Sequence, residues 1–139
     1  MKHRNNTPQS VNFVDMEEAG NFFIPEAGRQ IIKSAESWQQ LWEKYWNQYS
    51  GEGQKTAPPD VDFNRKMVVV LTWGQGYSGC ANHVKTVEQV ERTGDTLKII
   101  IGPLPSLGPC DMKVAPVQMI RIPRMEIPIV FEGDVPGAN

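Results

Sequence analysis

The fold of this chain is decided by residues 61–80, which read VDFNRKMVVVLTWGQGYSGC. At the centre, Met67 to Leu71 form a continuous apolar run rich in valine, and such a run is typical of a strand buried on both faces. Aspartates precede the run and the glycine-rich segment 74–76 follows it, so turn-forming residues bound it on both sides. We therefore predict that this run is the central strand of a β-rich domain.

Length and composition indicate an ordinary globular protein. The chain has 139 residues, of which 40% are hydrophobic and 22% charged, and its formal net charge is −2. We expect a single globular domain over residues 11–132, a flexible lead-in over 1–10 and a frayed tail over 133–139. The weak charge argues against a nucleic-acid partner, and no apolar run reaches the roughly 20 residues of a transmembrane helix.

An amphipathic helix is predicted from about Ser37 to Gln48. Ser37 and Gln40 have the spacing of a capping box at its start. Aromatic and apolar residues then recur at helical spacing: Trp38, Leu41, Trp42, Tyr45 and Trp46. We interpret this stripe as a wall of the core. The predicted class is thus α+β and β-rich, a small antiparallel sheet or sandwich with this helix packed on it.

The remaining strands are predicted to be short. The apolar pattern indicates edge strands or a hairpin early in the chain, a hairpin that turns near Gly94, and two strands close to the C-terminus. In the first arm of that hairpin, valines stand three residues apart instead of two, which predicts a β-bulge. The expected segments are 11–16, 21–24, 30–33, 82–92, 95–102, 117–122 and 127–131.

Cys80 and Cys110 are the most informative pair of side chains. If the hairpin turns near Gly94, residues close to 80 lie opposite residues near 108, which brings the two cysteines within disulfide reach. Closing a loop of this size stabilises a fold by about 3–4 kcal/mol in the chain-entropy model. A disulfide would also place the protein in an oxidising compartment.

The same cysteines allow a second interpretation. Residues 80–83 read CANH, so Cys80 and His83 could bind zinc together with Cys110 and Asp111, or pair a thiolate with an imidazole. That reading makes the chain a thiol- or zinc-dependent enzyme. Zinc sites more often show two closely spaced ligand pairs, and the sequence has one. We therefore expect no metal, no cofactor and no catalytic residue, with this enzyme as the alternative.

The order of motifs resembles the PrcB-like family of protease-complex-associated domains. The resemblance covers residues 31–131 and rests on SAESWQQLW (34–42), PDVDF (59–63), MVVV (67–70), GYSG (76–79), GPC (108–110) and IPR (122–124). This chain departs from the family pattern in having one glycine, not two, before Tyr77, and Cys80 after the motif. The family has no assigned catalytic residue, so the resemblance carries none over.

The resemblance implies a non-enzymatic accessory domain of an exported bacterial protein that associates with and stabilises a protease. We expect it in the periplasm or at the cell surface, with the signal peptide absent from this sequence; a cytoplasmic protein is the alternative. No feature of the sequence specifies an oligomeric state. A partner is expected to contact the turn after the central strand and the proline-rich loop, at Gln75, Gly76, Tyr77, Ser78, Leu104 and Leu107.

Overall fold

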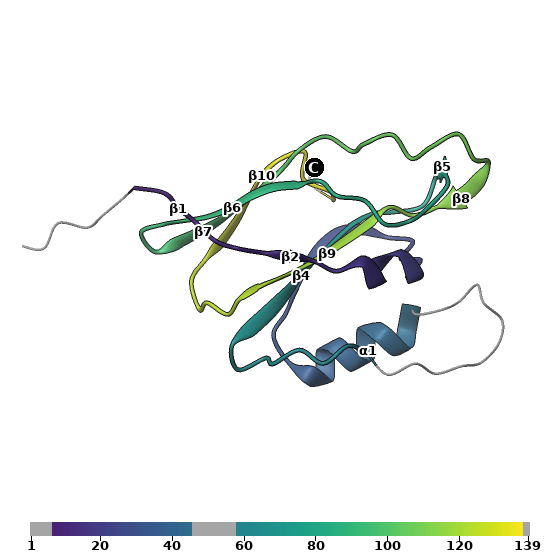
Figure 1. The fold of residues 1–139 in the computed structure, drawn as a ribbon. Coiled ribbons are helices and arrows are strands. Elements are labelled where there is room, and N and C mark those ends of the chain that lie inside the picture. Colours follow the sequence, from purple (N-terminus) through teal and green to yellow (C-terminus); the bar gives the residue numbers. More distant parts are fainter. Residues whose placement is uncertain (1–6, 46–57, 138–139) are drawn as a thin grey trace, which may run out of the picture.

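The described part of the chain forms two four-stranded sheets, a two-stranded ribbon, one α-helix and one short 3-10 helix (Figure 1). The computed structural model describes residues 7–45 and 58–137. The strand orders are β1-β6-β7-β10 in the first sheet, β2-β9-β4-β3 in the second, and β5-β8 in the ribbon. The elements are β1 (Gln9–Ser10), β2 (Val14–Asp15), η1 (Glu17–Asn21), β3 (Ala27–Ile32), α1 (Ala35–Tyr45), β4 (Lys66–Trp73), β5 (Tyr77–Gly79), β6 (Val87–Thr93), β7 (Thr96–Ile101), β8 (Met112–Val114), β9 (Val117–Pro123) and β10 (Ile129–Gly133).

Strand β4 is the central strand that the apolar run predicts. It pairs with β3 on one side and β9 on the other, and its residues 67–72 are all buried. Alternate side chains of a strand point to opposite faces. Val68 and Val70 belong to a core on the helix side, whereas Met67, Val69 and Leu71 belong to a second core between the two large sheets. The architecture is therefore helix on sheet on sheet.

Helix α1 covers the outer face of the β4 sheet. Its Trp38 and Trp42 are buried, and Phe22 meets the Trp42 ring edge to face with centroids 5.0 Å apart. The Trp38 indole donates a hydrogen bond of 3.0 Å to the Pro59 carbonyl, so its polar end is satisfied. The stripe is core, as predicted, up to Tyr45; Trp46 and the predicted end at Gln48 lie outside the described residues. Neither α1 nor η1 is long and apolar enough to cross a membrane.

The start of the helix differs from the prediction. Helix α1 begins at Ala35, and the Ser37 amide donates to the Ser34 hydroxyl over 3.1 Å. Ser34 is thus the N-cap and Ser37 is the N3 residue, whereas the sequence predicted a box of Ser37 and Gln40. The first helical bond, from the Trp38 amide to the Ser34 carbonyl (3.0 Å), fixes this register.

The β6–β7 hairpin and its bulge form as predicted, with a shorter first arm. Gly94 has φ 60° in the two-residue turn, where glycine carries no steric penalty. Opposite Ile100 and Ile101 stand Gln89 and Val87, which leaves Glu88 as the extra residue of the bulge. The first arm begins at residue 87 rather than 82. Strand β10 lies parallel to β7, the exception in otherwise antiparallel sheets.

Within the described residues, parts of the predicted lead-in and of the predicted tail belong to strands or contact them. Residues 9–10 of the expected lead-in form β1. Of the expected strand 21–24, Asn21 is the last residue of the 3-10 helix η1 and residues 22–24 follow it without forming a named strand. At the other end, Gly133 belongs to β10 and Pro136 is buried. The Asp134 amide donates a hydrogen bond of 2.9 Å to the Ile101 carbonyl. Residues 133–137 thus lie beside β3 and β7. Residues 1–6 and 138–139 lie outside the described residues.

The observed cap gives a first prediction. Ser34→Ala should lower the free energy of unfolding by about 1 kcal/mol, because it removes the hydroxyl that accepts the N3 amide. Ser37→Ala should cost less, because the Ser34 acceptor remains. Urea denaturation of the two variants would measure both losses, and a larger loss for Ser37→Ala would contradict the observed cap.

Candidate functional site

The β5–β8 ribbon stands apart from both hydrophobic cores. Tyr77 pairs with Val114, Ser78 with Lys113 and Gly79 with Met112. Among the described residues, neither core includes any residue of 74–86 or 102–116. Figure 1 shows the ribbon at the end of the molecule opposite the β6–β7 turn. Other contacts must therefore hold it in place.

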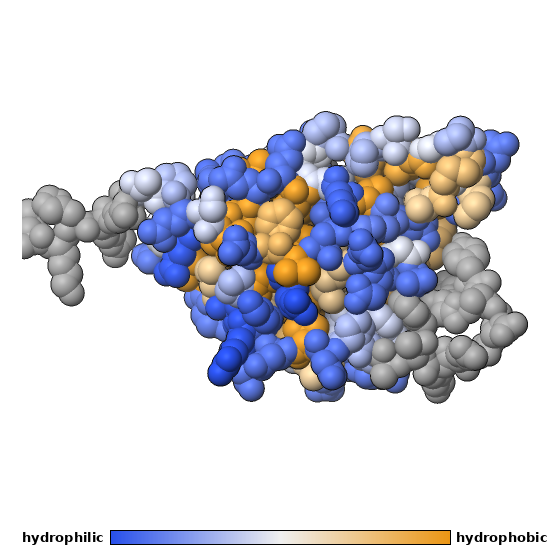
Figure 2. Space-filling view, in the orientation of Figure 1, coloured by the Kyte–Doolittle hydropathy of each residue, from blue (hydrophilic) through white to orange (hydrophobic). Residues whose placement is uncertain are grey.

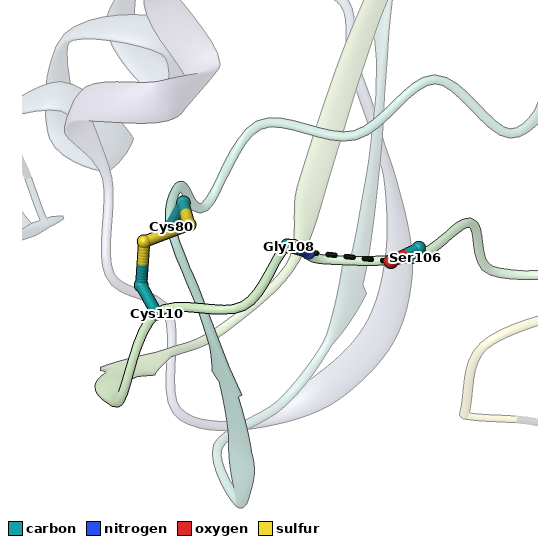
Figure 3. The surroundings of a disulfide bond; sticks show 4 residues. All are labelled: Cys80, Ser106, Gly108 and Cys110. Carbon is teal, nitrogen blue, oxygen red and sulfur yellow. Dashed lines mark hydrogen bonds between the residues drawn. A yellow bond between two sulfur atoms is a disulfide. The ribbon is translucent and has the colours of Figure 1, made fainter.

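A disulfide between Cys80 and Cys110 fastens the ribbon to the loop before β8 (Figure 3). The two Cα atoms are 4.9 Å apart, within the usual range for a disulfide. Beside the bridge, the Cys80 amide donates a hydrogen bond of 2.7 Å to the Leu107 carbonyl. Gly108 adopts φ +90°, and a Cβ added there would stand 2.7 Å from the Cys80 sulfur. Only glycine fits this position.

Gly79 is the second glycine that the site requires. A Cβ added at this position would collide with the side chain and carbonyl of Leu107. The missing side chain thus lets the loop lie directly on β5. In the structure, Gly79 allows close packing between two segments that are distant in the chain.

A hollow of about 340 Å³ opens at this ribbon. Four residues that the sequence proposed for a partner line it, Gln75, Gly76, Tyr77 and Ser78. Of the proposed leucines, Leu107 packs on Gly79 and neither it nor Leu104 lines the hollow. Sequence reasoning missed three further lining residues, Phe23, Lys113 and Val114. The apolar-polar alternation of residues 112–114 was a signal for Lys113 and Val114, but three residues are too few to predict a strand, and no local pattern pointed to Phe23.

Exposed apolar surface lies over the same ribbon. The Met112 residue is 57% exposed, more than the other large hydrophobic residues described as exposed, which are Val14 and Val130. Figure 2 shows apolar surface where β5 and β8 lie in Figure 1. An exposed thioether is suited to a protein contact, because methionine adapts to many partner shapes.

His83 lies in a different environment from the one the zinc interpretation requires. Its Nε2 is 2.6 Å from the Asp15 carboxylate, and both side chains are largely buried. Cys80 and Cys110 are bonded to each other. Within residues 7–45 and 58–137, no three His, Cys, Asp or Glu side chains form a metal-binding group. The structure thus does not assemble Cys80, His83 and Cys110 into the predicted alternative site.

Asp15 also connects to a buried amide. Its other oxygen accepts a hydrogen bond of 2.9 Å from Gln118, which is 1% exposed. The Gln118 carbonyl oxygen accepts three hydrogen bonds, from the Thr86 amide, the Thr86 hydroxyl and the Val87 amide, over 2.7–3.0 Å. This network fixes the segment that follows the ribbon to β2 and β9.

The network predicts an asymmetric mutational effect. Gln118→Met keeps the approximate volume but leaves buried donors of residues 86 and 87 without their acceptor, so the free energy of unfolding should fall by about 2–4 kcal/mol. Gln89→Met makes the same chemical change at an exposed position and should shift it by less than about 0.5 kcal/mol. Urea denaturation of the two variants would measure both changes in the free energy of unfolding. Equal losses of stability would contradict the buried role of Gln118.

The close packing at Gly79 predicts a local effect. Gly79→Ala should push Leu107 away from β5 and accelerate hydrogen exchange of the Cys80 amide by about tenfold or more, as overpacking costs about 1–3 kcal/mol. Gly28→Ala is the matched control, because a Cβ there meets nothing within 4 Å. Amide exchange followed by NMR would test the pair, and an unchanged Cys80 amide in Gly79→Ala would refute the packing argument.

No protein-family model, curated protein or solved structure matches this chain.

Proposed function

We propose that this chain is a non-enzymatic accessory domain of an exported bacterial protein, and that it binds a protein partner through the β5–β8 ribbon. The observation that carries the proposal is the 57% exposed Met112 on a ribbon that a disulfide holds outside both cores. The resemblance to PrcB-like domains suggests a protease as the partner and stabilisation of that protease as the role.

The geometry of the ribbon favours binding in two ways. A disulfide-linked surface is already ordered before it meets a partner, so association loses less conformational entropy. The hollow at the ribbon combines aromatic and apolar walls with hydroxyl, amide and ammonium groups, which suits an interface that needs both burial and orientation.

The disulfide also supports an exported location. Disulfides persist in oxidising compartments and are rare in the reducing cytosol. The enzyme alternative needs Cys80 and Cys110 as thiolates, and bonding between the two sulfurs removes both. An accessory role is therefore the function that the oxidised protein supports best.

The partner surface can be tested by site-specific crosslinking. A photoreactive residue at position 112 should crosslink one defined partner in the exported fraction of the source bacterium. The same residue at position 14 is the matched control, because Val14 is 50% exposed but lies on β2, in a different sheet.

Charge substitution provides the second arm of this test. Met112→Glu should weaken capture of that partner at least about tenfold, since it places a charge in an apolar contact, while Val14→Glu should leave capture unchanged. Equal crosslinking at positions 112 and 14, or full capture by Met112→Glu, would exclude the ribbon as the partner surface. A protease among the crosslinked proteins would support the stabilising role.

A further inference from the structure

We infer that the Cys80–Cys110 disulfide makes the ribbon redox-sensitive. When the disulfide is reduced, the ribbon opens locally while both cores stay folded. The segment that moves is residues 103–113, which we call the proline loop because it contains Pro103, Pro105 and Pro109. This inference goes beyond the proposed function and does not require the proposed partner.

Burial shows why opening would be local. No residue of the proline loop is buried; two leucines are partly buried and the other residues are exposed. Immediately outside the loop, Ile101 and Gly102 on one side and Val114 and Ala115 on the other are buried. The chain is thus anchored at both ends of the loop, and the loop between them adds nothing to either core.

In the part of the chain that the structure describes, few contacts hold the proline loop to the rest of the protein, and they surround the disulfide. They are the hydrogen bond from the Cys80 amide to the Leu107 carbonyl, the packing of Leu107 on Gly79, and the short β5–β8 pairing. A two-stranded ribbon of this length is marginal by itself in water. Its order therefore depends on the covalent link between Cys80 and Cys110.

Both cysteines are exposed, so a reductant can reach them. A thiolate of a dithiol attacks one cysteine sulfur, the S–S bond breaks, and the other cysteine leaves as a thiolate that takes up a proton. The second thiol of the reductant then resolves the mixed disulfide. Two electrons and two protons pass to the protein, and the dithiol becomes a disulfide; an oxidised dithiol reverses the reaction.

Opening would also remove the hollow. One wall comes from residues 75–78 and another from Lys113 and Val114 on the partner strand of the ribbon. Once β8 separates from β5, these walls no longer face each other. Whatever binds across the ribbon would be held only by the oxidised protein.

Hydrogen exchange with and without dithiothreitol tests the inference on the full chain. After reduction, amides in 77–80 and 103–113 should exchange about tenfold faster or more, while amides of β4 and β9 keep their protection. Removal of the reductant and reoxidation should restore the original rates. Unchanged exchange in the ribbon, or an equal increase in β4 and β9, would overturn the inference.

The double variant Cys80→Ser, Cys110→Ser supplies the control for effects of the reductant itself. Its ribbon should exchange at the rate of the reduced wild type, with or without dithiothreitol. A ribbon as protected as that of the oxidised wild type would overturn the inference. The wild type is also compared with itself before and after reduction. This comparison tests the inference even when the double variant does not fold.

Discussion

The structure depends on one strand that serves two cores. Strand β4 sends Val68 and Val70 to the helix side and Met67, Val69 and Leu71 to the sheet side, so each alternate residue is committed to a different layer. A register slip of one residue would reverse every side chain at once. Helix, central sheet and outer sheet are therefore specified together, and this rigid three-layer body is what the ribbon projects from.

The ribbon is ordered by different physics. Hydrophobic burial holds the sandwich, whereas a covalent bond, two closely packed glycine positions and a few hydrogen bonds hold Tyr77–Gly79 against Met112–Val114. A surface built in this way can keep apolar side chains such as Met112 exposed, because it does not need to bury them to stay folded. The ribbon is suited to binding because its exposed apolar side chains are not needed to keep it folded.

Sequence reasoning predicted the parts that follow from periodicity. The central strand, the indole stripe of the helix and the bulged hairpin all carry a local repeat that can be read from neighbouring residues. The parallel pairing of β10 with β7, the role of Gly79 and the meeting of Asp15 with His83 arise from contacts between distant segments. No local pattern encodes these contacts. The Ser34 cap was missed because two serines near the helix start, Ser34 and Ser37, could each serve as a cap.

The base of the ribbon is fixed independently of its disulfide. The Asn82 side chain accepts a hydrogen bond from the Ala115 amide (2.9 Å) and donates to the Phe22 carbonyl (3.1 Å), which ties the segments after β5 and after β8 to each other and to the helix-side layer. The Asp15–Gln118 network fixes the next residues of the same segment. These hydrogen bonds lie between the disulfide and the two cores. Breaking the Cys80–Cys110 bond would therefore loosen the proline loop while the two large sheets stay in place.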